Sequence, residues 1–176
     1  MPQCRTDPLL RGVFERISEV TGAHPRHFGS VQVVRYREGE YYATHHDQTH
    51  FVSPPLPEGA RVLTLLMYLD DVEEGGETAF PDLGIEVAPK KGKAVLWPSV
   101  ANENTSMTEL FTFHQARPVV RGSKHVANVW IHQFDYFSPR VRRGCAMESF
   151  AEGSLDPRWE ACQRLERRPE ERCERA

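Results

Sequence analysis

The sequence lacks any recognisable cysteine motif. The 176 residues include four cysteines, which are Cys4, Cys145, Cys162 and Cys173. None belongs to a Cys-x-x-Cys pair, which argues against a zinc ribbon and against a thioredoxin-like redox motif. Two disulfides and four free thiols both remain open, so cysteine usage does not fix the compartment.

Long hydrophobic runs and an excess of either charge are also missing. The most apolar stretch, residues 62–69, is short and contains Thr64, so no membrane span is expected. The 22 Lys and Arg residues against 25 Asp and Glu residues give a net charge of −3, without the basic excess typical of nucleic-acid or anionic-membrane partners. A hydrophobic content of 39% is ordinary for a globular chain, and the length favours one principal domain.

Local signals predict a mainly β protein between two helical ends. A helix is predicted over residues 7–21, with Asp7 as its cap, Pro8 at its first position and Gly22 as its stop. Its predicted apolar face consists of Leu9, Leu10, Val13, Phe14, Ile17 and Val20. Strands are predicted over residues 32–37, 41–46, 61–69, 85–88, 94–97, 110–117 and 125–134.

Turn signals separate these strands, including residues 74–76 and 121–123. They leave too little chain for helical crossovers, which favours an antiparallel sandwich or jelly roll. The Arg- and Glu-rich residues 139–176 are predicted to form a helical C-terminal tail. The catalytic domain is accordingly expected within residues 1–138.

A His-x-Asp sequence is the first candidate for chemistry. In a strand, His45 and Asp47 would point to one side and His46 to the other. Two imidazoles and one carboxylate form the ligand set of mononuclear non-haem Fe(II) sites, so a third ligand would come from elsewhere in the chain. On its own the motif is weak, and a surface loop is the alternative.

His114 and Lys124 lie before and after the predicted turn at residues 121–123. We therefore expect them on adjacent antiparallel strands. One face of the last strand would carry Lys124, Val126, Asn128, Trp130 and His132. A lysine buried there would need an anionic partner.

Five motifs follow one another in a fixed order. They are residues 32–47, 61–69, 74–81 and 89–92, and then His114 with Lys124 ten residues later. Over about residues 4–136 the chain thereby resembles the prolyl 4-hydroxylase branch of the iron(II)- and 2-oxoglutarate-dependent oxygenases. The resemblance implies a mainly β fold, the double-stranded β-helix or jelly roll, with flanking N-terminal and C-terminal helices.

The resemblance also implies a ligand set. His45, Asp47 and His114 would bind Fe(II) and form the catalytic centre. Lys124 would pair with the distal carboxylate of 2-oxoglutarate, for which a compact ammonium is well suited.

Further roles follow from the same resemblance. Tyr36, Tyr68 and Trp130 would line the cosubstrate pocket, with ordinary core packing as the alternative for all three. Arg61 and His132 match positions near the peptide site.

The reaction implied is hydroxylation of peptidyl proline at C4, with O2 and 2-oxoglutarate consumed, succinate and CO2 released, and L-ascorbate as a reductant of stalled iron. The partner would be a proline-rich or hydroxyproline-type protein, and the location would be the endoplasmic reticulum or secretory pathway. A polyproline II ligand would dock on aromatic side chains. The candidates, each of which could equally be core or singly exposed, are Tyr41, Tyr42, Phe51 and Trp97.

Two other functions compete with this interpretation. One is a related oxygenase that acts on another residue or on a small molecule, because one fold hosts many chemistries. The other is a non-catalytic module that holds a metal, such as Zn(II), and binds a proline-rich partner without turnover. The presence of all four residues His45, Asp47, His114 and Lys124 counts against the second.

Overall fold

The computed structural model describes residues 7–48, 58–102 and 104–136. These divide into two compact units. The helical unit contains the described residues of 7–29, 58–59 and 132–136, and the β unit contains those of 30–48 and 60–131. The predicted C-terminal tail, all four cysteines, and His50 and Phe51 lie outside the described residues.

The helical unit begins with α1 (Pro8–Thr21), whose ends are as predicted. The Asp7 carboxylate accepts hydrogen bonds from the backbone N–H groups of Leu9 and Leu10, and Gly22 ends the helix in the left-handed conformation. A 3-10 turn, η2 (Pro25–His27), follows. None of the described helices has the length and apolarity that crossing a membrane requires.

The buried face of α1 is narrower than predicted. Phe14 and Ile17 are its buried residues, and the Phe14 ring packs against Phe28 at 5.8 Å between centroids. Leu9 and Val20, which were expected on the apolar face, are 77% and 72% exposed. They lie in the end turns of the helix, beyond the packed middle.

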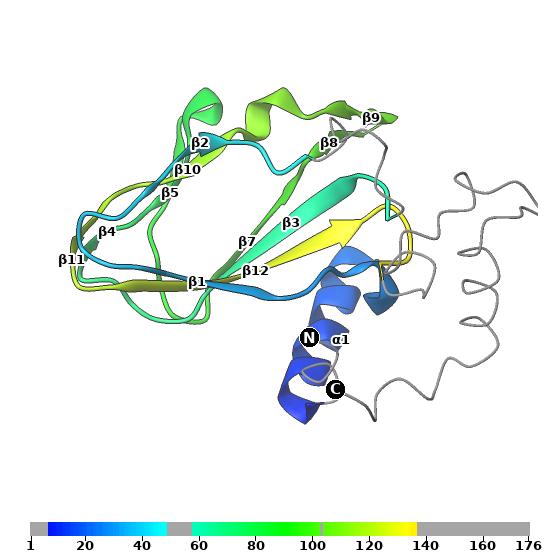
Figure 1. Ribbon diagram of the computed structural model, residues 1–176, viewed down its shortest axis with the longest axis horizontal. Helices are drawn as coiled ribbons and strands as arrows, with labels where there is room; N and C mark the ends of the chain where they lie inside the picture. The colour runs from blue at the N-terminus through cyan, green and yellow to red at the C-terminus, as the bar shows by residue number, and fades with distance from the viewer. Residues whose placement is uncertain (1–6, 49–57, 103, 137–176) are drawn as a thin grey trace, which may run out of the picture. The chain divides into compact units, whose positions relative to one another are not determined.

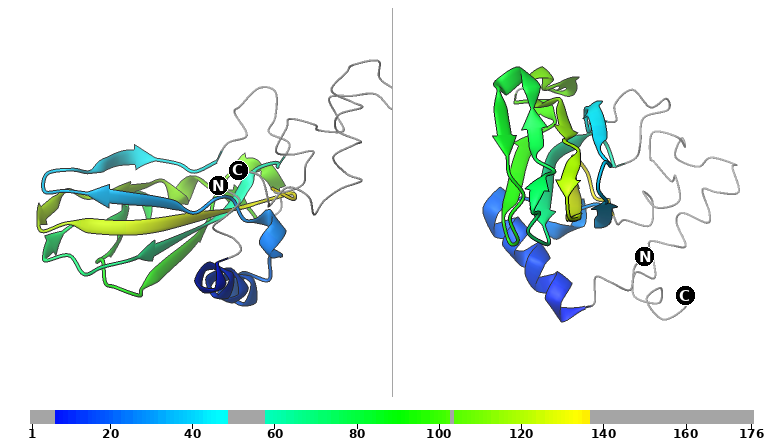
Figure 2. Two further views of the ribbon diagram at one scale, coloured as in Figure 1. Left: turned by 60° about the horizontal axis from the view of Figure 1, so that its bottom comes forward. Right: turned by 90° about the vertical axis from the view of Figure 1, so that its left-hand side faces the viewer.

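Two four-stranded sheets form the β unit. The major sheet has the order β1 (Gln32–Tyr36), β12 (Lys124–His132), β3 (Arg61–Tyr68) and β7 (Ala94–Pro98). The minor sheet has the order β2 (Tyr42–His45), β10 (His114–Ala116), β5 (Thr78–Phe80) and β6 (Ile85–Val87). The two sheets lie face to face (Figures 1 and 2), which confirms the predicted jelly roll.

Two short ribbons complete the β unit. β4 (Glu74–Gly75) pairs with β11 (Val119–Arg121), and β8 (Val100–Ala101) pairs with β9 (Asn104–Thr108). The 3-10 turn η3 (Pro81–Leu83) follows β5. The ribbons and β5 were not predicted. Four of these strands have only two or three residues, and β9 contains one apolar residue, Met107, so none shows a clear alternating pattern.

His114 and Lys124 do not lie on adjacent strands, contrary to the prediction. β10 belongs to the minor sheet and β12 to the major sheet. The turn at Gly122 forms as expected, but it joins β11 rather than β10 to β12. Pro118 explains the interruption, since it has no N–H to continue the ladder of β10.

Two further local predictions were wrong. The predicted strand 110–117 begins with a 3-10 turn, η4 (Leu110–Thr112), which the Glu109 side chain caps by accepting from the Phe111 N–H. Residues 74–76, predicted as a turn, contribute β4 instead. At Gly75 a Cβ would lie 2.5 Å from the Pro118 carbonyl oxygen, so the pairing of β4 with β11 requires glycine there.

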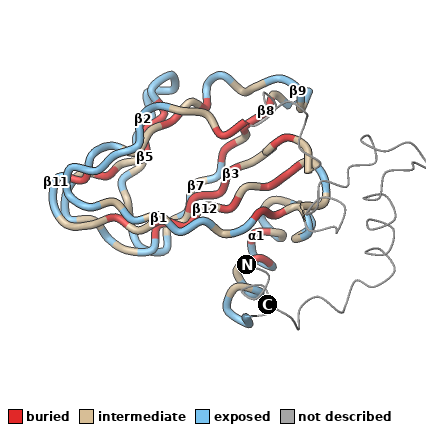
Figure 3. Tube along the Cα trace, viewed as in Figure 1, coloured by how far each residue is buried: buried red, intermediate tan, exposed pale blue. Residues whose placement is uncertain are grey.

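The core of the β unit lies between the two sheets, where buried residues line β3 and β12 (Figure 3). Each large apolar side chain buried there contributes about 1.5–3 kcal/mol. The central cluster consists of Leu66, Tyr68, Phe80, Trp97 and Val126. This cluster fixes the two sheets around the cavity described next.

Candidate metal site

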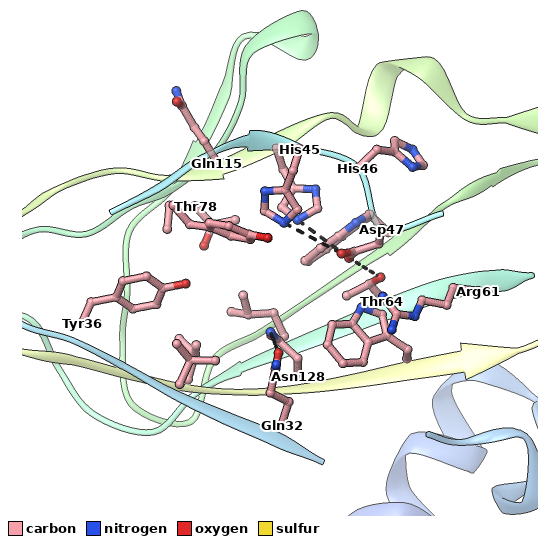
Figure 4. Close-up of a pocket in the computed structure, with 18 of the residues that line it drawn as sticks. Gln32, Tyr36, His45, His46, Asp47, Arg61, Thr64, Thr78, Gln115 and Asn128 are labelled. Carbon is pink, nitrogen blue, oxygen red and sulfur yellow. Dashed lines mark hydrogen bonds and ion pairs between the residues drawn. The ribbon is translucent and has the colours of Figure 1, made fainter. Parts of the chain in front are cut away.

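Three ligand-type side chains meet on the minor sheet. His45 ends β2, Asp47 follows two residues later, and His114 begins β10 directly opposite His45 in the ladder. Their ligand atoms all lie within 4.8 Å of one another. His45 Nε2 is 3.9 Å from Asp47 Oδ1, and His114 Nε2 is 3.8 Å from Asp47 Oδ2 (Figure 4).

Backbone carbonyls orient both imidazoles. His45 Nδ1 lies 2.9 Å from the Ala43 oxygen, and His114 Nδ1 lies 3.0 Å from the Thr112 oxygen. A carbonyl only accepts, so each Nδ1 carries the proton and each Nε2 lone pair faces the cluster. Burial lowers the pKa of His114, with the Asp47 charge opposing that shift, and the resulting neutral imidazole is the form that binds metal.

The Asp47 carboxylate is held by a buried hydroxyl. Thr64 Oγ1 on β3 donates to Asp47 Oδ2 at 2.6 Å and lies 3.4 Å from Ser99 Oγ. Thr64 is 1% exposed. Sequence reasoning gave Thr64 no role, because its contact with Asp47 depends on how two distant segments meet.

Replacing Thr64 with valine is expected to weaken metal binding by about 10-fold to 100-fold, the usual effect of losing a group that orients a ligand. Valine keeps the shape of threonine, so the sheet should persist. Anaerobic Fe(II) or Co(II) titration measures the affinity. Thr108→Val is the matched control, because Thr108 Oγ1 is buried without a hydrogen-bond partner in the described part of the chain; equal affinities of the two variants would contradict the role of Thr64.

His46 points away from the three ligand-type residues, as strand alternation predicted (Figure 4). Its Nε2 lies 2.9 Å from the Glu109 oxygen and 3.2 Å from Thr112 Oγ1. Its ring meets the Phe113 ring edge-on at 5.0 Å. His46 thus stabilises η4, and the Thr112 carbonyl of this turn orients His114.

The ligand-type residues open into a cavity of about 510 Å³ between the two sheets. The minor sheet supplies His45 and His114, and the major sheet supplies Tyr36, Lys124 and Trp130. One cavity therefore joins a candidate metal site to a cationic side chain that comes from the opposite sheet.

Lys124 is the most unusual residue of this cavity. It is 1% exposed, and its Nζ has no hydrogen-bond partner among the described residues. The Nζ lies 5.3 Å from the Tyr36 ring centroid and 5.7 Å from that of Tyr68. Burial lowers the pKa of Lys124 to about 8, although the charge of Glu77 opposes the shift. A buried ammonium in this state is completed by an anionic ligand.

Residues 31–132 match the family described as the 2OG-Fe(II) oxygenase superfamily. The chain belongs to this superfamily. Its members' name specifies Fe(II) and 2-oxoglutarate, and the described residues fit both groups. Two imidazoles and a carboxylate suit Fe(II), and the unpartnered Lys124 ammonium suits the free end of a dicarboxylate.

Prolyl 4-hydroxylases are among the similar proteins. The chain is 38% identical over 129 residues to prolyl 4-hydroxylase subunit alpha-2 of Gallus gallus, a match covering 72% of this chain and 24% of that protein. It is 32% identical over 147 residues to prolyl 4-hydroxylase 2 of Arabidopsis thaliana, covering 72% and 48%. The chain thus spans about a quarter of the first relative and about half of the second.

A solved structure gives the same family. The chain is similar to the viral collagen prolyl hydroxylase of Paramecium Bursaria Chlorella virus-1, in its 2OG complex, with 34% identity and a TM-score of 0.60. The match covers 70% of this chain and 71% of that one. The jelly roll of the β unit is therefore that of a 2OG-Fe(II) oxygenase.

The two tyrosines expected in the cosubstrate pocket differ in place. Tyr36 lines the cavity of the oxygenase, and burial raises the pKa of its hydroxyl, which keeps it a hydrogen-bond donor. Tyr68 is buried in the core, where its hydroxyl donates to Thr78 Oγ1 at 2.7 Å. Thr78, which sequence reasoning did not single out, lines the cavity in its place.

Trp130, also expected in the cosubstrate pocket, lines the cavity. Of the two residues expected near the peptide, Arg61 lines the cavity too, with its guanidinium 4.0 Å from the Trp130 ring centroid. His132 does not line this cavity; its ring packs on Tyr136 at 4.7 Å. His132 lies two residues after Trp130 on β12, and the β unit ends at Ile131.

The aromatic candidates for a polyproline groove are not alike. Tyr42 lines the cavity and is 53% exposed, with its ring 4.0 Å from that of His45. Tyr41 is exposed. Trp97 is buried between Phe80 and the His114 ring, so it supports the candidate ligand His114 rather than a surface groove.

The lowered pKa of Lys124 predicts a pH-dependent stability for the ligand-free protein. An unfolded lysine titrates near 10.5 and the folded one near 8, so between these values the unfolded chain binds more protons and stability rises with pH. Burying the charged Lys124 lowers the free energy of unfolding by roughly 3 kcal/mol. This destabilisation is complete below pH 8 and disappears above pH 10.5.

Urea unfolding at a series of pH values measures this effect. Lys124→Met keeps the length of the side chain without its charge, so we expect this variant to be more stable than the wild type at pH 7. The difference should vanish towards pH 10.5. The same pH dependence in both proteins would show that Lys124 carries no such penalty.

Proposed function

We propose that this chain is an Fe(II)- and 2-oxoglutarate-dependent dioxygenase domain that hydroxylates peptidyl proline at C4. The observation that carries the proposal is the buried, unpartnered ammonium of Lys124 in the same cavity as His45, Asp47 and His114. The likeness to prolyl 4-hydroxylases supports the choice of proline.

In this proposal the minor sheet supplies the metal ligands. His45 and His114 would bind Fe(II) through Nε2, and Asp47 through a carboxylate oxygen, with Thr64 holding that carboxylate. The bound Fe(II) and 2-oxoglutarate, with O2, supply the oxidation that releases succinate and CO2 and adds one oxygen atom to the substrate. The carbonyls of Ala43 and Thr112 keep the two imidazoles in the binding tautomer throughout.

Residues of both sheets would bind the cosubstrate: Lys124 and Tyr36 on the major sheet and Thr78 on the minor sheet. Lys124 would donate to the distal carboxylate, and the hydroxyls of Tyr36 and Thr78 are neutral donors in the wall of the same cavity. Tyr68 donates its hydroxyl proton to Thr78 Oγ1 and thereby orients the Thr78 hydroxyl. The aromatic core beside this end excludes water, which strengthens the charge pair.

The opposite end of the cavity would receive the polypeptide. Arg61 stacks there on Trp130, which the resemblance had assigned to the cosubstrate pocket, and Tyr42 offers an exposed aromatic face beside His45. A polyproline II segment loses little entropy on binding such surfaces. The proposal also includes L-ascorbate as a reductant and a location in the secretory pathway. Both rest on the family resemblance alone.

The experiment compares two metals in one assay. Metal-free protein is loaded with Fe(II) or Zn(II), and succinate is measured with 2-oxoglutarate, O2, ascorbate and a proline-rich peptide. We expect peptide-stimulated succinate with Fe(II) and none with Zn(II). Tight peptide binding with both metals and no succinate with either would favour a non-catalytic binding module.

A further inference from the structure

A pair of amide side chains lies on the cavity face of the major sheet. Gln32 on β1 and Asn128 on β12 are directly opposite each other in the antiparallel ladder. Asn128 Nδ2 donates a long hydrogen bond of 3.5 Å to Gln32 Oε1. Both side chains line the cavity, on the wall that faces His45 and Asp47 (Figure 4).

The other end of the Asn128 amide has no partner. Its Oδ1 is buried and accepts no hydrogen bond from the described residues. A buried acceptor without a donor is unfavourable, and in a binding cavity it marks the place where a ligand or a water donates. A ligand that donates an N–H or O–H group to Asn128 Oδ1 would therefore bind more favourably than one that does not.

Neither of the groups assigned to the cavity can supply that donor. 2-Oxoglutarate carries only acceptor oxygens at neutral pH, and Fe(II) binds lone pairs rather than donating a proton. Asn128 also lies on the same strand face as Lys124 and Trp130, separated from Lys124 by Val126. It stands between the cosubstrate end and the Arg61–Trp130 end of the cavity.

We propose that Asn128 Oδ1 accepts a hydrogen bond from a main-chain N–H of the polypeptide substrate, and that Gln32 holds the Asn128 amide in the orientation this requires. The Gln32 NH2 group can donate to a carbonyl of the same peptide. This inference rests on the proposed function, since it assigns a recognition role within that site.

The pairing has a consequence for specificity. Proline has no backbone N–H, so the donor must belong to a neighbouring residue that is not proline. The Gln32–Asn128 pair therefore favours prolines that alternate with other residues over uninterrupted polyproline. A site built to accept a hydrogen bond rejects a ligand that lacks the donor, because its own buried acceptor stays unpaired.

The test uses an alternating Ala-Pro decapeptide and the same peptide with every alanine N-methylated. The KM of each peptide is measured by 2-oxoglutarate-dependent hydroxylation with the wild type and with Asn128→Leu. For the wild type, methylation is expected to raise KM by about 10-fold or more. In Asn128→Leu the unmethylated peptide should already show the raised KM, and methylation should add less than about two-fold.

Asn102→Leu is the matched control, because Asn102 is exposed and does not line the cavity; it should keep the full methylation effect. Asn128→Val, which suits a strand, repeats the test if the leucine variant does not fold. An equal methylation effect in the wild type and in the Asn128 variants, or none in the wild type, overturns the inference while hydroxylation continues. If the wild type oxidises neither peptide, the proposed function is overturned and this inference with it.

Discussion

The His114→Ala variant is expected to lose Fe(II)-dependent succinate formation by at least about 100-fold, more than the usual effect of removing a group that only orients a ligand. His114 is buried against Trp97 and Phe80, and its Nε2 is directed at the Asp47 carboxylate. Two ligands, His45 and Asp47, would remain, and one of them is partly exposed. Loss of metal, rather than loss of substrate binding, is therefore the expected cause.

Metal titration separates these causes. His114→Ala should bind Fe(II) or Co(II) much more weakly than the wild type, with a circular dichroism spectrum that keeps its β signal. His24→Ala is the control, because His24 is exposed and serves only to cap η2. Normal turnover by His114→Ala would refute the assigned ligand set.

The Lys124→Ala variant is expected to need about 100-fold more 2-oxoglutarate for half-maximal turnover. Removing one partner of a buried charge pair costs about 2–5 kcal/mol, which corresponds to between roughly 30-fold and several thousand-fold in affinity. Lys124 is the residue whose ammonium is buried without a hydrogen-bond partner in the described ranges, so no neighbouring lysine replaces it.

A cosubstrate analogue makes this prediction specific. 2-Oxopentanoate has the chain length of 2-oxoglutarate but a methyl group in place of the distal carboxylate. The wild type should strongly prefer 2-oxoglutarate, and Lys124→Ala should lose that preference. Lys91→Ala is the control, because Lys91 is exposed. An undiminished preference in Lys124→Ala would mean that another residue holds the distal carboxylate.

Some of this architecture was accessible from the sequence because it depends on neighbours in the chain. The caps of α1 at Asp7 and Gly22 are local chemistry. The alternation of His45, His46 and Asp47 was predicted from the period of a strand, and it holds although β2 ends at His45. The resemblance then supplied His114 and Lys124, which local patterns alone do not connect.

Several of the errors share one physical cause, namely long-range pairing. A turn at Gly122 identifies two strands joined by a hairpin, but not the sheet to which an earlier strand such as β10 belongs. The contact of Thr64 with Asp47 and the burial of Tyr68 depend on how β3 packs against distant segments. Such contacts depend on how the two sheets pack together. A short stretch of sequence does not contain that information.

The most direct test of the central claim is mass spectrometry of a proline-rich peptide after incubation with the Fe(II)-loaded protein, 2-oxoglutarate, O2 and ascorbate. We expect a mass gain of about 16 Da, one oxygen atom, located by fragmentation on proline and matched by an equal amount of succinate. Oxygen found on another residue, or succinate formed with no oxidised peptide, would contradict prolyl hydroxylation while leaving an oxygenase. A peptide that stays unmodified with no succinate formed would contradict the account as a whole.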